Sequence, residues 1–237
     1  MKEFKMKNKH GVMHNLVLGM MGFALLMISD WLIGACGKGN SSNGIVQSNW
    51  AKAGAWRYEA AVLIAGVAVF LVYVGMKEMI RQMKLTRRKR DPWSIRAAQV
   101  FELGGTATIV ASLFLRVKGV ILPILYKKLY STSLMGADML AVVDDVFFYI
   151  SIPFYVLSIL MIVCTSVPYM YQVWNGRLRI PKWFILINPM VFWVLGWILR
   201  LFKNYLITDF TACMGSFGLM MMCWCILQHV AHIPERD

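Results

Sequence analysis

Long apolar runs separated by short polar segments dominate this chain. Six of them are long enough to cross a bilayer, whose hydrocarbon core takes about 20 residues of helix. They predict helices over residues of about 12–36, 59–80, 97–126, 136–168, 181–199 and 206–233. Because the runs leave little chain between them, we expect a single transmembrane domain over residues 1–237. The predicted fold is an all-α, polytopic transmembrane bundle of about six helices.

Composition and charge support a membrane protein. Of the 237 residues, 59% are hydrophobic and 16% are charged, whereas a soluble domain is about half apolar and a quarter charged. A net charge of +13 suggests nucleic-acid binding in a soluble protein, but here the basic residues gather between the apolar runs. Such clusters orient the chain and face anionic headgroups. We therefore expect the bilayer as partner, with anionic headgroups at the loop 81–96, and no nucleic acid or cofactor.

The distribution of basic residues also predicts an orientation. If the N-terminus is cytoplasmic, 16 of the 25 Lys and Arg residues lie on the cytoplasmic side. This bias predicts a multi-pass protein of the bacterial cytoplasmic membrane with both termini inside. An alternative for the N-terminus is a lipoprotein signal, because a basic segment and an apolar run precede Ile33-Gly34-Ala35-Cys36. The length of that run is more typical of a spanning helix.

Charged residues at the ends of the apolar runs collect in the predicted outer half of the membrane. A charge near mid-membrane costs a few kcal/mol, so it marks a functional site or pairs with another charge. Two interpretations stay open. The residues line an outward-facing polar cavity that binds or transports a small polar or lipid-like molecule, or they form ion pairs that lock the bundle. The candidate ligand-binding residues are Asp30, Arg57, Arg116, Asp144, Asp145 and Arg200.

Two further function classes are compatible with the sequence. One is an intramembrane enzyme acting on a lipid or isoprenoid-like substrate, with paired carboxylates (Asp144 with Asp30, or Glu102) as acid and base. The other is a structural or regulatory subunit. The sequence contains no GxSxG, Walker or GxGxxG motif, so no catalytic residue is assigned.

The four histidines all fall on the predicted cytoplasmic side. His10 and His14 are four residues apart, and His229 and His232 are three apart, so each pair shares a helix face. If the first and last helices are neighbours, the four imidazoles could converge on a transition metal. The sequence has no HExxH motif, and histidine is common at a wet interface. We therefore expect no metal site.

Two motifs stand out at helix ends: Ser29-Asp30-Trp31-Leu32-Ile33-Gly34, and Pro181-Lys182-Trp183 followed by Ile187-Asn188-Pro189. Together with Gly215 and Gly218 in the last run, they resemble an uncharacterised family of bacterial six-helix membrane proteins. Phe217 stands where that family would have a polar residue. The resemblance implies the six-helix fold and no particular activity, and it implies that Asp30 and Asn188 have more than an incidental role.

Overall fold

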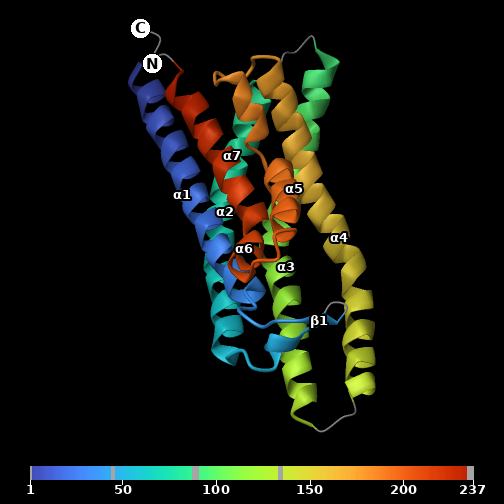
Figure 1. Cartoon of the computed structure of the whole chain (residues 1–237). Coiled ribbons are helices and arrows are strands. Elements are labelled where there is room, and N and C mark those ends of the chain that lie inside the picture. The colour runs from blue at the N-terminus through green and yellow to red at the C-terminus, as the bar shows by residue number, and fades with distance from the viewer. Residues whose placement is uncertain (1, 44–45, 87–90, 133–135, 234–237) are drawn as a thin grey trace.

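Helices make up nearly all of the computed structural model, which describes residues 2–43, 46–86, 91–132 and 136–233. Figure 1 shows them as a bundle of long, roughly aligned rods. The α-helices are α1 Lys2–Gly34, α2 Ala55–Leu85, α3 Pro92–Tyr130, α4 Gly136–Trp174, α5 Pro189–Arg200, α6 Tyr205–Thr211 and α7 Met214–Ala231. Two short 3₁₀ helices, η1 Ser48–Trp50 and η2 Lys182–Leu186, and an antiparallel strand pair, β1 Ser42–Asn43 and β2 Val46–Gln47, join them.

The predicted all-α polytopic class is confirmed. Five helices in the described part of the chain are long and apolar enough to cross a membrane, judged by length and composition: Lys9–Gly34, Ala55–Leu85, Pro92–Tyr130, Asp138–Trp174 and Met214–Ala231. The chain is thus a multi-pass membrane protein in fold. Which membrane it occupies and which way it faces stay predictions.

The fifth and sixth predicted spans are interrupted in the structure. The segment 181–199 begins as η2 and becomes α-helical only at Pro189. Asn188 is extended, and its side chain accepts hydrogen bonds from the backbone N–H groups of Met190 and Val191. A residue before proline is driven out of the helical region, and an Asn at this position caps the helix that follows. The segment 206–233 divides into α6 and α7. Non-helical backbone is tolerated at membrane depth where protein buries it, and Asn188 is fully buried.

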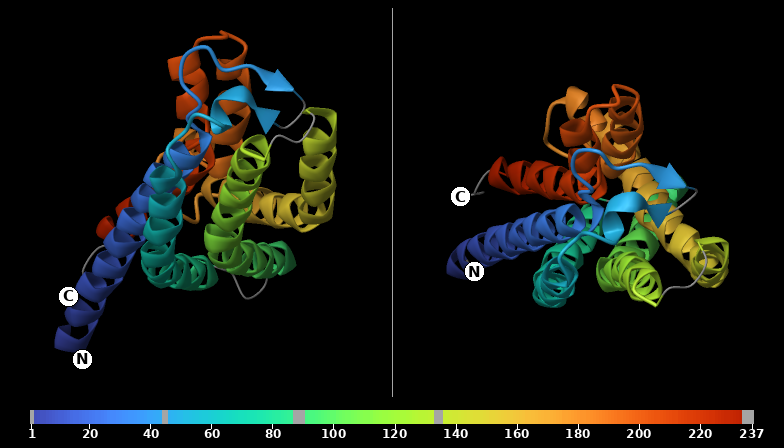
Figure 2. Two further views of the ribbon diagram at one scale, coloured as in Figure 1. Left: turned by 90° about the horizontal axis from the view of Figure 1, so that it is seen from below. Right: turned by 60° about the horizontal axis from the view of Figure 1, so that its bottom comes forward.

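The packing order places α1 against α2 and α7, α2 against α3, α3 against α4, and α5 against α7. Figure 2 shows α1 to α4 side by side along one face, with α7 behind α1. The first and last helices meet at one end of the bundle, where the Lys9 ammonium donates to the carbonyls of Ala231 and Ile233. α1 and α2 cross where Gly19 faces Gly75, so closely that a Cβ on either glycine would strike the backbone of the other.

Asp91 fixes the start of α3 and joins it to Arg177, in the segment that follows α4. Its carboxylate accepts hydrogen bonds from the backbone N–H groups of Trp93 and Ser94, at 3.0 and 3.3 Å, and pairs with Arg177. Desolvation raises the pKa of Asp91, but the Arg177 hydrogen bond, the N–H groups and the Arg177 charge together hold that pKa below its usual 3.8. A lowered folded-state pKa means that the carboxylate stabilises the fold above the usual pKa and loses this contribution as pH falls through the folded value.

We expect Asp91→Asn to lower the melting temperature slightly at pH 7, because Asn keeps the helix cap but loses the charge that pairs with Arg177. The difference from the wild type should shrink as the pH falls below 3.8. Thermal unfolding in detergent between pH 7 and pH 3 measures it. Glu59→Gln, which neutralises an exposed carboxylate, is the control. A difference that stays constant down to pH 3 would contradict the charge-based explanation.

Candidate functional site

A polar cluster buried among three helices contains two of the predicted site residues. Arg116 of α3 donates from Nη2 to Asp30 Oδ2 of α1, at 2.7 Å, and to Ser216 Oγ of α7, also at 2.7 Å. Ser216 Oγ in turn donates to Asp30 Oδ2 at 2.5 Å. The Arg116 and Asp30 side chains are 5% and 19% exposed. The cluster therefore ties α1, α3 and α7 together inside the bundle.

The members of this cluster largely satisfy one another. Arg116 Nη1 also donates to the Ala111 carbonyl at 3.4 Å, while its buried Nε has no hydrogen-bond partner among the residues that the structure describes. A buried ion pair is strongly destabilised when one member is removed, because the other charge is left uncompensated. This arrangement fits an ion pair that holds helices together.

The other two predicted arginines bind groups at helix ends. Arg57 donates from Nε to the Leu32 carbonyl at 2.7 Å and also contacts the Ala35 carbonyl, at the end of α1. The last carbonyls of a helix lack intrahelical partners and carry partial negative charge, which a cation stabilises. Arg200 Nε donates to Thr211 Oγ1 at 2.7 Å and so links α5 to α6.

The structure does not bring Asp144 and Asp145 to the Asp30–Arg116 pair. Both are exposed on α4, and neither makes a hydrogen bond or ion pair within the described residues. α4 has 39 residues, about 58 Å at helical rise, against a hydrocarbon core of about 30 Å. Thirty residues separate Asp144 from Trp174 at the other end of α4. With Trp174 at one interface, Asp144 and Asp145 would lie beyond the core at the other, where their charge costs little.

The histidines do not form a metal site among the residues that the structure describes, which contain no group of three or more potential His, Cys, Asp or Glu ligands. The first and last helices are indeed neighbours. However, His10 and His14 are exposed. His229 is buried, and its Nδ1 accepts the Arg179 backbone N–H at 2.7 Å. His232 Nδ1 lies 2.7 Å from the carbonyl of Gln228, within its own helix.

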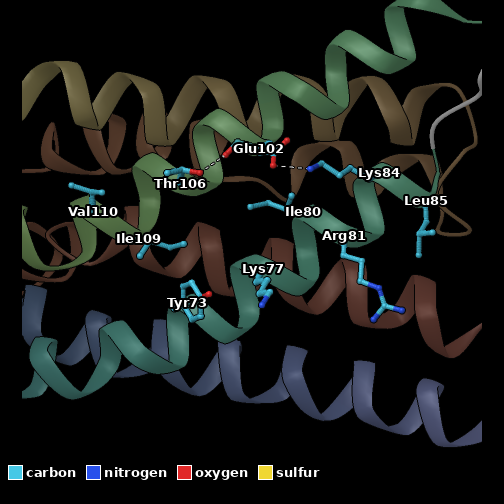
Figure 3. A pocket seen from close by; sticks show the side chains of 10 residues that line it. All are labelled: Tyr73, Lys77, Ile80, Arg81, Lys84, Leu85, Glu102, Thr106, Ile109 and Val110. Carbon is cyan, nitrogen blue, oxygen red and sulfur yellow. Dashed lines mark hydrogen bonds and ion pairs between the residues drawn. The ribbon is translucent and has the colours of Figure 1, made fainter.

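A groove between α2 and α3, at the end of the bundle that carries Lys9 and Ile233, combines a basic region with an apolar one (Figure 3). Its volume is about 660 Å³. Lys84 points across it to Glu102 of α3, with 2.6 Å between Nζ and Oε1. The lining residues are Tyr73, Lys77, Ile80, Arg81, Lys84, Leu85, Glu102, Thr106, Ile109 and Val110.

The cations of the groove lie nearer the end of the bundle than Ile109 and Val110, with the apolar Ile80 and Leu85 among them. Lys77, Arg81 and Lys84 follow one another along the final turns of α2, whereas Tyr73 lies a turn farther into the bundle. On α3, Val110 lies eight residues beyond Glu102, about 12 Å deeper at helical rise. Figure 3 shows this order, with Tyr73, Ile109 and Val110 at one end and Lys84 and Arg81 at the other. The groove is therefore amphipathic along the direction of the helices.

The groove is not among the predicted sites, although the sequence carries one signal for it. Lys77, Arg81 and Lys84 are spaced by four and three residues, so they lie along one side of a helix. In the sequence these cations count only toward the excess of basic residues that orients the chain, and two of them belong to the loop 81–96. The tract Arg87-Arg88-Lys89-Arg90 of the same loop lies outside the described residues.

Comparison with known proteins identifies the chain by family alone. Residues 6–232 match a family described as a family of unknown function (DUF6796). The chain belongs to this family. The match covers all the described helices but the first residues of α1, in agreement with the resemblance to an uncharacterised family. No curated protein and no solved structure matches the chain.

Proposed function

We propose that this multi-pass membrane protein binds an anionic membrane lipid in the groove between α2 and α3. The observation that carries the proposal is the order of groups along that groove, with three cations toward the end of the bundle and Ile109 and Val110 deeper in. A lipid has the same polarity along its length. Its phosphate would lie among Lys77, Arg81 and Lys84, and an acyl chain would follow Ile109 and Val110 toward the membrane interior.

At the opposite end of the bundle, four of the predicted site residues already bind other groups of the protein. This favours the α2–α3 groove over the predicted outer cavity as the lipid site. Asp30 and Arg116 are bonded to each other and to Ser216. Arg57 and Arg200 are bonded to a carbonyl and a hydroxyl. The groove, in contrast, has more cations than carboxylates among its lining residues. The hypothesis of an outward-facing polar cavity stays a prediction.

The paired-carboxylate enzyme has less support than lipid binding. Asp30 is committed to Arg116 and Ser216, and Glu102 pairs with Lys84 near the other end of the bundle. A carboxylate that serves as general acid or base must reach the proton that it transfers. No hydrogen bond in the described part of the chain joins Asp30 to either Asp144 or Glu102.

The triple variant Lys77→Gln, Arg81→Gln, Lys84→Gln tests the proposal. Each basic residue near an anionic headgroup contributes about 1 kcal/mol, so we expect more than tenfold weaker binding of dioleoyl phosphatidate and dioleoyl phosphatidylglycerol. Native mass spectrometry of the full chain in detergent, titrated with each lipid, measures the affinity. Dioleoyl phosphatidylcholine, which is zwitterionic, should bind more weakly to the wild type.

A matched control removes three cations at the same end of the bundle but outside the groove: Arg96→Gln, Arg179→Gln and Lys182→Gln, all exposed residues. We expect this control to retain most of the lipid affinity. An equal loss in both triple variants would show that net charge attracts the lipid without a site. Equal binding of anionic and zwitterionic lipids by the wild type would also overturn the proposal.

A further inference from the structure

The charge that lines the α2–α3 groove points to a particular class of headgroup. Three cations, Lys77, Arg81 and Lys84, and one carboxylate, Glu102, line the groove, so its described lining has a formal charge of +2. Of the three cations, Lys84 is the one that points to Glu102 (Figure 3). Glu78 lies behind Arg81 on the buried side of α2, with 3.3 Å between Arg81 Nη1 and Glu78 Oε2. Among the described lining residues, Tyr73 is the only other titratable side chain.

The three cations are not equally available to a ligand. Lys84 is held by Glu102 at 2.6 Å, and Arg81 is shared with Glu78. Lys77 is exposed and lies over the Tyr73 ring, 5.8 Å from its centroid, with no carboxylate partner in the part of the chain that the structure describes. An arriving headgroup would therefore meet Lys77 and compete with Glu102 for Lys84.

We propose, on the basis of the lipid-binding function above, that the groove selects lipids that end in a phosphomonoester over those with a phosphodiester. A phosphomonoester carries a charge of about −1.5 to −2 at pH 7 and three terminal oxygens. A phosphodiester carries a single charge and two such oxygens. The doubly charged group matches the +2 lining more closely, and its extra oxygen gives it one more acceptor for the ammonium groups of Lys77 and Lys84.

Phosphatidate and phosphatidylglycerol with the same two oleoyl chains separate these classes. We expect the wild type to bind phosphatidate about fivefold more tightly at pH 7.5, because one further charge interacts with the basic lining. At pH 5.0 a phosphomonoester has regained its second proton, since its second pKa is about 6. The preference should then nearly vanish, while phosphatidylglycerol at the same two pH values reports any titration of the protein itself.

Inorganic phosphate distinguishes a lipid site from a simple phosphate site. It lacks the apolar part that would contact Ile109 and Val110, so it should not displace phosphatidate at an equal concentration. Displacement by inorganic phosphate would overturn the assignment to a lipid. Equal affinity for the two lipids at pH 7.5 would overturn the phosphomonoester preference but leave the proposed function intact. If neither lipid binds better than phosphatidylcholine, both proposals fail.

Glu102→Gln gives a test that does not depend on removing a cation. If Glu102 competes with the ligand for Lys84, the variant should bind both lipids more tightly and should gain most for phosphatidate. The rival role for Glu102 is to accept hydrogen bonds from a hydroxylated headgroup such as glycerol. In that case Glu102→Gln would weaken phosphatidylglycerol binding, and the preferred class would be a hydroxyl-bearing phosphodiester. Glu102 is half-exposed, so the substitution should leave the fold intact.

Discussion

We expect Arg116→Met to lower the free energy of unfolding by about 3 kcal/mol, because it leaves the buried Asp30 carboxylate without its counter-ion. Met has a similar length and fills most of the space, so the loss reports the charge more than a cavity. In the wild type the guanidinium joins Asp30 and Ser216 at 2.7 Å each. In the variant only Ser216 would still donate to the Asp30 carboxylate. Unfolding by sodium dodecyl sulfate in mixed micelles measures the change.

A double-mutant cycle distinguishes the pair from the sum of two side chains. Asp30→Asn with Arg116→Met removes both charges, so we expect it to be less destabilised than the two single variants added together. Lys118→Met is the control on the same helix. Lys118 is also buried, but it packs over the Phe147 and Phe154 rings, so its loss removes two cation–π contacts of about 1 kcal/mol each and leaves no buried carboxylate unpaired. Additive losses for Asp30 and Arg116 would show that the pair does not hold α1 to α3.

The length of the apolar runs was enough to predict the bundle, because an apolar segment of about 20 residues has few other stable environments. Run length could not predict how the fifth segment is broken. Apolar residues continue on both sides of Asn188, so hydropathy alone favours one helix through it. The break follows from local chemistry instead, since Pro189 forces the preceding residue to be extended and Asn188 then caps α5.

The buried cluster could be predicted in part. Asp30 and Arg116 were candidates because charge is rare within apolar runs, but their pairing depends on which faces of α1 and α3 meet. Ser216 had no comparable signal, since a serine within an apolar helix commonly bonds to its own backbone. The groove is similar: the spacing of Lys77, Arg81 and Lys84 is visible in the sequence, whereas Glu102 reaches Lys84 only through the packing of α2 on α3.

Gly75→Val should also destabilise the bundle, by up to about 3 kcal/mol. A Cβ at residue 75 would meet the Cα of Gly19 on the neighbouring helix, and a backbone atom cannot move aside as a flexible side chain can. α1 and α2 would have to separate along their interface. In a membrane, close packing rather than the hydrophobic effect holds helices together, so lost contact is not replaced. The same detergent titration measures the loss.

Gly66→Val is the matched control for this prediction, because Gly66 lies on the same helix and a Cβ there meets no atom of the described residues within 4 Å. Both variants introduce the same β-branched residue into α2, so the effect of helix propensity cancels between them. We expect Gly66→Val to stay within about 0.5 kcal/mol of the wild type. Equal destabilisation by the two variants would mean that the valine disturbs α2 itself and that the Gly19–Gly75 crossing contributes little. A larger loss for Gly75→Val would show that α1 and α2 need these glycines to approach each other.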